Sequence, residues 1–438
     1  MTHTALLGRR LANFRATRPA ALARPDGRGR DRSVEHSRRL AAALDAQVVE
    51  TDRGTYVRAE PQNVELPLDR ERLARLPGQP PADARLVCLD TETTGLATAA
   101  GTVAFLVGVG WWAGTTFRQV QLLLPDQPDE PAFLDALAAF VPPDAWLVTY
   151  NGRGFDWPLI EARYRMDRRA APAHAGHLDL LPVVRRIFRH RMADARLKTA
   201  EEQLLGIRRS NDVEGWEIPG RYLEFLRGGS AEPLAEVVRH NERDVRSLAA
   251  LLAHIDGTLA DRDARNSAPR GDLEALARMF RRDRRHVEAF ECLEPALRRP
   301  AAPFGTLDDR RFRDGLAAER ARTLRRLGRH TEALDAWRGL ATAGGPLTGV
   351  ALVELAKALE HRWSDPAGAF EAVERGRALA ERARGIGRPM PLLEADLARR
   401  RRRLAERLAR RRGAVAAAAV TTAVSAGPAA VSSAVTTA

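Results

Sequence analysis

The clearest hydrophobic pattern in the chain lies between residues 85 and 151. Three apolar runs, LVCL, TVAFLVGVGWW and FRQVQLLLP, are rich in β-branched and aromatic residues and are separated by segments that contain glycine. This pattern predicts three strands joined as an antiparallel meander. A helical pattern over residues 130–140 precedes a fourth predicted strand, AWLVTYN (145–151).

Helical patterns dominate the next hundred residues. One helix is expected to start near Phe155, and the short apolar run HLDLLP (177–182) comes before several more. Strands followed by flanking helices predict an α/β layered domain, which we place at residues 84–256. The later helices are expected at residues 183–190, 197–205, 219–227 and 232–254.

Residues 1–83 carry weaker patterns. Residues 1–35 are rich in Arg, Pro, Gly and Ala without a sustained period, which predicts a flexible basic arm. Residues 36–83 are interpreted as a small extension that ends in a linker containing PGQPPAD. Within and beside this extension, the pattern predicts a short helix over residues 35–44 and two strands, at residues 47–51 and 54–59.

Beyond residue 256 no strand pattern remains, and residues 270–410 are expected to be helical. Ala289, Ala333 and Ala369 occupy similar places in three helical pairs, separated by 44 and 36 residues. These separations bracket the period of about 34 residues that is typical of tetratricopeptide arrays. A degenerate repeat of this kind and an ordinary helical bundle both fit. Residues 411–438 lack aromatic residues and, after Arg412, all charge, which predicts a disordered tail.

Composition narrows the class of protein. A length of 438 residues suggests two or three domains. With only Cys88 and Cys292, neither a disulfide framework nor a zinc site built from cysteines can form. No apolar run reaches the roughly 18 residues that a membrane helix needs, so we expect a cytoplasmic protein without membrane contact.

The net charge of +13 is concentrated at the two ends of the chain. Residues 1–40 carry a net charge of +7 and residues 399–438 one of +8. Such basic ends are suited to holding a nucleic-acid backbone without reading its sequence. Because 68 of the 70 basic residues are arginine, solvated ends of an arginine-rich chain are an equally good interpretation.

The first candidate catalytic residues lie where the first strand of the meander ends. Asp90 and Glu92 are two residues apart, so a strand places both carboxylates on one face. Two neighbouring carboxylates repel each other unless a cation lies between them, and oxygen ligands suit Mg²⁺ or Mn²⁺. Thr93, Gly95 and Leu96 follow, and glycine is favoured where a chain turns close to a ligand. An exposed pair of acids on a strand is the alternative.

Two further motifs carry acids. In Asn151-Gly-Arg-Gly-Phe155-Asp156, the aspartate falls in the first turn of a helix, near the edge of the sheet where Asp90 lies. A simple helix cap is the alternative for this residue. His240 and Asp244 lie four residues apart on one face of a predicted helix, where an imidazole can accept a proton from water. An exposed helical ion pair is the alternative there.

Together the three motifs resemble those of the four-carboxylate, ribonuclease-H-like 3′→5′ exonucleases. The intervening segments TYNGRGFDWPLIEARY, LKTAEEQLLGI and GWEIPGRYLEFLRGG resemble the bacterial YprB-type subfamily. The resemblance covers about 40 % of the chain. It implies a mixed sheet flanked by helices and metal-dependent hydrolysis of DNA or RNA. A helical, repeat-like region after the nuclease domain is also familiar in that group.

Carried over by position, the resemblance implies that Asp90, Glu92, Asp156 and Asp244 hold two Mg²⁺ or Mn²⁺ ions. His240 would be the general base, although the well-known branches have Tyr four residues, or His five residues, before the last Asp. The 3′-terminal nucleotide would be positioned by Asn151, Phe155 and the backbone of Thr93, Gly95 and Leu96.

Other polar and aromatic residues near these motifs have structural interpretations. His177 and Asp179 lie in HLDLLP, where a packed and satisfied side chain is a better interpretation than a metal ligand. Lys198 is interpreted as a surface lysine. Most tryptophans are expected in the core rather than as platforms for base stacking; they are Trp111, Trp112, Trp146, Trp157 and Trp216.

Two alternatives to an exonuclease remain open at this point. A structure-selective endonuclease would use the same metal site, since the motifs specify hydrolysis but not the need for a strand end. A binding adaptor would recruit a protein partner through its helical C-terminal region and carry a vestigial nuclease domain. The presence of all four acids argues against the adaptor.

Overall fold

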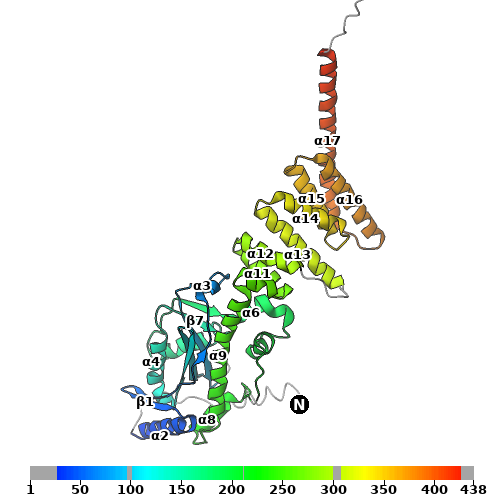
Figure 1. Ribbon diagram of the computed structural model, residues 1–438. Helices are drawn as coiled ribbons and strands as arrows, with labels where there is room; N and C mark the ends of the chain where they lie inside the picture. Colours follow the sequence, from blue (N-terminus) through cyan, green and yellow to red (C-terminus); the bar gives the residue numbers. More distant parts are fainter. Residues whose placement is uncertain (1–26, 96–100, 211, 299–306, 426–438) are drawn as a thin grey trace, which may run out of the picture. The chain divides into compact units, whose positions relative to one another are not determined.

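The computed structural model describes residues 27–95, 101–210, 212–298 and 307–425 (Figure 1). Leu96, one of the predicted substrate-binding residues, lies outside these residues. The chain divides into two compact units, residues 1–275 and 276–438. Each unit is described separately.

The first unit is built on one mixed sheet. Its strands are ordered β1-β2-β6-β5-β4-β7-β8, and β3 pairs with β6. The central strands β6, β5 and β4 are antiparallel, whereas β4, β7 and β8 are parallel. The strands are β1 (Gln47–Thr51), β2 (Gly54–Ala59), β3 (Val64–Glu65), β4 (Arg85–Thr93), β5 (Ala104–Ala113), β6 (Thr116–Leu123), β7 (Ala145–Thr149) and β8 (Gly176–Asp179).

Helices cover the sheet, as Figure 1 shows for α4 (Glu130–Phe140) and α9 (Leu234–Leu259) on its two sides. α9 packs against β4, β5 and β6, and α4 packs against β2 and β6. The described helices and the meander with added parallel strands confirm the predicted α/β class. The other helical segments are η1 (Gln127–Asp129), α5 (Asp156–Met166), α6 (Leu180–Phe188), η2 (Arg189–Arg191), α7 (Leu197–Ala200), η3 (Glu201–Leu205), α8 (Ile218–Leu226), α10 (Arg262–Ser267) and α11 (Arg270–Arg282).

Two glycines of β5 allow α9 to lie close to the sheet. A Cβ atom at Gly108 would come within 2.2 Å of the Asn241 Oδ1 atom, and one at Gly110 within 2.9 Å of the Val245 side chain. Gly108 also faces Asp90 across the β4–β5 ladder. The small residues in VGVG therefore bring α9 next to the end of β4.

The predicted N-terminal strands form, and they belong to the central sheet. β2 pairs with β6 in the register Val57 to Leu123, so residues 47–59 extend the meander. α2 (Gly27–Leu44) packs on β1 and β2 and buries Leu40 completely. This helix is longer than the one predicted at residues 35–44, while α3 (Arg70–Leu73) precedes the proline-rich segment before β4.

The second unit is helical in its described residues, as predicted. Consecutive helices pack against each other from α12 to α17. Ala289, Ala333 and Ala369 are all buried in the second helices of their pairs. A tetratricopeptide repeat stays a prediction. The helices are α12 (His286–Arg298), α13 (Leu307–Arg326), α14 (His330–Thr342), α15 (Thr348–His361), α16 (Pro366–Gly385) and α17 (Pro391–Ser425).

The last helix differs from the sequence expectation. α17 continues to Ser425 and so includes residues 411–425, which we had expected to be disordered. Alanine has the highest helix propensity, and the run AVAAAAV continues a helix that has already started. Residues 426–438 lie outside the described residues. No helix within the described residues is long and apolar enough to cross a membrane.

Candidate active site

The end of β4 presents the first two acids. Alternation along the strand puts Asp90 and Glu92 on the face toward α9. The Asn241 side chain of α9 donates to the Asp90 Oδ2 atom at 2.9 Å and to its backbone oxygen at 3.2 Å. Gln121 of β6 donates in turn to the Asn241 Oδ1 atom at 2.9 Å. Two neutral amide side chains, those of Gln121 and Asn241, therefore hold Asp90 in place. The sequence patterns indicated neither of them.

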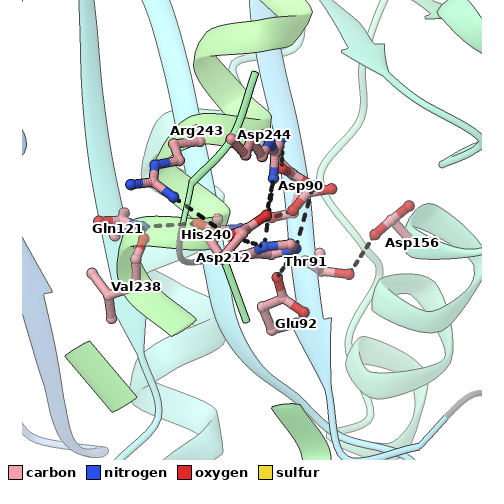
Figure 2. A network of polar contacts seen from close by, with 12 residues as sticks. Asp90, Thr91, Glu92, Gln121, Asp156, Asp212, Val238, His240, Arg243 and Asp244 are labelled. Atoms are coloured by element: carbon pink, nitrogen blue, oxygen red, sulfur yellow. Dashed lines mark hydrogen bonds and ion pairs between the residues drawn. The ribbon is translucent and has the colours of Figure 1, made fainter. Parts of the chain in front are cut away.

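His240 and Asp244 project from one face of α9 toward the same place (Figure 2). The His240 Nε2 atom lies 3.9 Å from the Glu92 Oε1 atom and 3.8 Å from the Asp244 Oδ2 atom. These side chains are mostly buried, with exposed fractions of 13–16 %. The predicted pair is therefore part of an enclosed cluster rather than an exposed helical ion pair.

Asp156 starts α5, as predicted, but stands to one side of the other acids in Figure 2. Its Oδ1 atom accepts a hydrogen bond of 2.5 Å from the Thr91 hydroxyl. Thr91 alternates with Asp90 and Glu92 along β4. The Asp156 carboxylate is therefore linked to the end of β4 by its hydrogen bond to the Thr91 hydroxyl.

The four acids influence one another electrostatically. Burial, followed by repulsion from Asp244, Asp156 and Glu92, raises the pKa of Asp90 well above its usual value. Burial, then repulsion from Asp244 and Asp156, likewise raises the pKa of Glu92. Burial also raises the pKa values of Asp156 and Asp244, although nearby groups oppose this effect at both residues. The cluster therefore carries more negative charge than its protein surroundings balance.

Three charged residues that the sequence reasoning missed complete the cluster. Arg209 donates to Glu201, Asp212 and Asp244, and its side chain is only 4 % exposed. Asp212 accepts a hydrogen bond of 2.9 Å from the His240 Nδ1 atom. Arg209 and Asp212 lie in the polar stretch RRSNDVE between two predicted helices, which has no period that indicates where its side chains point, and Glu201 lies in the helix predicted at residues 197–205.

The carboxylates of this cluster are chemically suited to hard divalent cations, but their spacing is too wide to hold one as they stand. Carboxylate oxygens are the ligands that Mg²⁺ and Mn²⁺ prefer. Six carboxylates surround the Arg209 guanidinium and the end of β4: Asp90, Glu92, Asp156, Glu201, Asp212 and Asp244. In the described residues, no three His, Cys, Asp or Glu side chains are close enough together to hold a metal ion as they stand. Binding an ion would therefore require the carboxylates to come closer together.

The predicted substrate-binding residues lie at the margins of this cluster. The side chain of Phe155 is exposed (53 %), immediately before Asp156. Asn151 has a left-handed backbone (φ 68°), and its N–H donates to the Asp179 Oδ1 atom at 2.7 Å. Thr93 donates to the Gly95 oxygen at 2.6 Å. A Cβ atom at Gly95 would make only an ordinary contact with Thr102 at 3.5 Å, so no steric crowding explains that glycine.

The structural interpretations of the remaining residues agree with their contacts. Asp179 is buried and caps α6 through the Leu181 N–H, at 3.0 Å. His177 forms a hydrogen bond of 2.8 Å with Thr149. Lys198 is exposed, as expected of a surface lysine. Trp112 and Trp157 are buried and Trp111 and Trp146 half-buried, whereas Trp216 is 68 % exposed and is not a core residue.

Comparison with known proteins agrees with this fold and places the chain in a family. The RNase_H superfamily profile (RNase_H_2) matches residues 87–256, which run from within β4 to within α9. The chain is also 32 % identical over 292 residues to the uncharacterized protein YprB of Bacillus subtilis (strain 168). This alignment covers 66 % of the chain and 68 % of YprB. The chain therefore belongs to the YprB family and carries an RNase H-like domain, which indicates a nuclease-type activity on nucleic acid.

Proposed function

We propose that this protein is a divalent-metal-dependent 3′→5′ exonuclease that hydrolyses phosphodiester bonds of DNA or RNA. One observation carries the proposal: Asp90, Glu92 and Asp244 lie together with His240, mostly shielded from solvent, at the end of the central strand of an RNase H-like sheet. Asp244 is paired with Arg209, whereas Asp90 accepts from the neutral amide of Asn241. Burying carboxylates without matching positive charge costs free energy, so such clusters are expected where a cation binds.

Asp90, Glu92, Asp156 and Asp244 are the residues that would hold two Mg²⁺ or Mn²⁺ ions. When bound, a pair of such ions supplies charge stabilisation to both the attacking and the leaving oxygen of a phosphodiester. Asp156 accepts from the Thr91 hydroxyl through one carboxylate oxygen, Oδ1, and would bind an ion through the other. His240 is suited to accept a proton from water, because its Nε2 atom faces Glu92 and Asp244 while its Nδ1 atom is held by Asp212.

Phe155 supports the assignment of an end-binding site. An exposed aromatic ring beside a ligand acid provides a surface on which a terminal base can stack. Asn151, Thr93, Gly95 and Leu96 would contact the same nucleotide. The 3′→5′ polarity rests on the resemblance of the three motifs to four-carboxylate exonucleases.

The test is cleavage of oligonucleotides that are labelled at the 5′ end, single-stranded and duplex, with Mn²⁺ or Mg²⁺. Stepwise shortening with release of mononucleotides is expected. Asp90→Asn should lower the rate by on the order of 10³-fold, equivalent to about 4 kcal/mol of activation free energy. Asp144→Asn is the matched control, because that side chain is 65 % exposed at the other end of β7.

Each other outcome points to a different function. Internal cuts that do not need a free end would replace the exonuclease with an endonuclease that uses the same site. Absence of cleavage, with equal binding of oligonucleotide by the wild type and Asp90→Asn, would favour an adaptor. An Asp90→Asn variant that cleaves at the wild-type rate would remove the carboxylate cluster from the reaction.

A further inference from the structure

The segment between η3 and α8 inserts one guanidinium among acids from three different places. Arg209 donates to the Glu201 Oε1 and Oε2 atoms at 2.5 and 2.6 Å, to the Asp212 Oδ2 atom at 3.0 Å, and to the Asp244 Oδ1 atom. Glu201 is itself 1 % exposed. A guanidinium with its planar fork of donors can join three carboxylates in fixed directions, which an ammonium cannot do.

These contacts determine which oxygen of Asp244 faces the active site. The Oδ1 atom is taken by Arg209, whereas the Oδ2 atom lies 3.8 Å from the His240 Nε2 atom. Rotation of the carboxylate would break a buried, charge-assisted hydrogen bond. Arg209 therefore leaves one defined oxygen of this predicted ligand directed toward Glu92 and His240.

Asp212 determines the orientation of His240 in a similar way. Its Oδ1 atom accepts from the His240 Nδ1 atom at 2.9 Å, and its Oδ2 atom accepts from Arg209. A carboxylate that accepts from one ring nitrogen fixes the ring and leaves the lone pair on the other nitrogen. In the neutral ring, the Nε2 atom would then carry the lone pair, on the side of Glu92 and Asp244.

We propose that Arg209 and Asp212 are positioning residues for the nuclease reaction. Asp212 holds His240 with the proton on Nδ1 and the lone pair on Nε2, and Arg209 holds Asp212 and Asp244 in register with each other. This inference rests on the proposed function and assigns roles to two residues outside the four-carboxylate motif.

Asp212→Asn tests the first half of the inference. Loss of an orienting partner of this kind typically costs about 10- to 100-fold, which we expect in kcat, with KM for the oligonucleotide unchanged. In a His240→Gln background the same substitution should have almost no further effect. Glu214→Gln is the matched control, because Glu214 is an exposed acid in the same segment.

A second readout does not depend on cleavage. In Mg²⁺-loaded protein labelled with ¹⁵N-histidine, the ring shifts of His240 should report a proton on Nδ1 alone. The ring signals of His240 are identified as those that disappear from the spectrum of His240→Gln. Asp212→Asn should mix the two tautomers, while Mn²⁺ affinity measured by electron paramagnetic resonance stays that of the wild type.

Arg209→Lys separates positioning from charge, since lysine keeps the charge but lacks the fork. The variant is expected to fold, to lose the single His240 tautomer and to lose kcat as Asp212→Asn does. Arg208→Gln, at the exposed neighbouring arginine, should match the wild type. Wild-type kcat and tautomer in Arg209→Lys would overturn the role of Arg209.

The role of Asp212 fails in two cases. A full loss of rate from Asp212→Asn in the His240→Gln background would show that Asp212 acts independently of His240. A loss of Mn²⁺ affinity as large as that of Asp244→Asn would make Asp212 a ligand instead. If the wild type cleaves no substrate, the proposed function fails, while the tautomer and the Mn²⁺ affinity still decide the positioning roles.

Discussion

The first unit contains two kinds of enclosed acid, which differ in whether their hydrogen-bond donor is charged or neutral. Glu130 of α4 is buried and receives both a 2.6 Å and a 2.5 Å hydrogen bond from Arg163, whose side chain is 8 % exposed. Asp90 is also enclosed, but it accepts from the neutral amide of Asn241. In a chain with 68 arginines, many acids have an arginine near enough to form an ion pair. Asp90, whose printed side-chain partner is a neutral amide rather than an arginine, therefore stands out within the candidate site, where the neighbouring Asp244 does pair with Arg209.

Breaking the Glu130–Arg163 pair should have the largest effect on stability. Glu130→Gln removes the carboxylate charge that receives two hydrogen bonds from the buried Arg163 guanidinium, and breaking a buried ion pair typically costs about 3–5 kcal/mol. The free energy of unfolding, measured by chemical denaturation, should fall by this amount. The exposed pair Arg221–Glu236 provides the control, since Glu236→Gln should cost at most about 1 kcal/mol. Equal losses in the two variants would contradict the distinction between buried and exposed pairs.

Gly108→Ala tests the contact that gives Asp90 its neutral partner. The new methyl group would lie 2.2 Å from the Asn241 Oδ1 atom and 2.7 Å from the Val245 side chain, so these side chains or α9 must shift. Overpacking of this kind costs roughly 1–3 kcal/mol, and we expect about 2 kcal/mol together with a loss of cleavage. Gly257→Ala on α9, where a Cβ atom meets nothing within 4 Å, is the control. Unchanged stability in Gly108→Ala would mean that the helix does not need this close approach.

Asp90→Asn should stabilise the protein in the absence of divalent ions. The substitution removes one charge from a group of acids that raise one another's pKa values, and the amide oxygen can still accept from Asn241. We expect a gain of about 1–2 kcal/mol, within the usual range for relieving a functional constraint. Thermal unfolding in chelator would show it as a higher Tm. A lower Tm would indicate that Asp90 has a structural role like that of Glu130.

His177 provides a third case, a half-buried group that favours its neutral form in the folded protein. Burial, followed by the charge of Arg153 and by His174, lowers its pKa to about 4. Because the unfolded chain binds the proton more readily, stability is complete above pH 6.5 and falls as the pH decreases through about 4. Allowing for partial exposure, the loss is about 1 kcal/mol. His177→Gln should flatten the curve of unfolding free energy against pH over this range, and a parallel curve would exclude His177 as its source.

The central strands, their order in the meander and α9 could be predicted because their hydrophobic periods are strong and local. The strands at residues 47–51 and 54–59 could also be predicted, but not their pairing with β6, since pairing depends on contacts distant in sequence. In the candidate site, spaced motifs indicated Asp90, Glu92, His240 and Asp244. Arg209 and Asp212 could not be found in this way, because they lie in an irregular segment without a period.

The pairing of β2 with β6 has a practical consequence for anyone who isolates the nuclease domain. The family match begins at residue 87, which suggests a fragment that starts just before β4. Such a fragment would lose Val57 and Leu40, both fully buried, and would leave the backbone of β6 as an open edge. Open edges of this kind recruit strands from other molecules and lead to aggregation. A soluble fragment should therefore begin at or before residue 27.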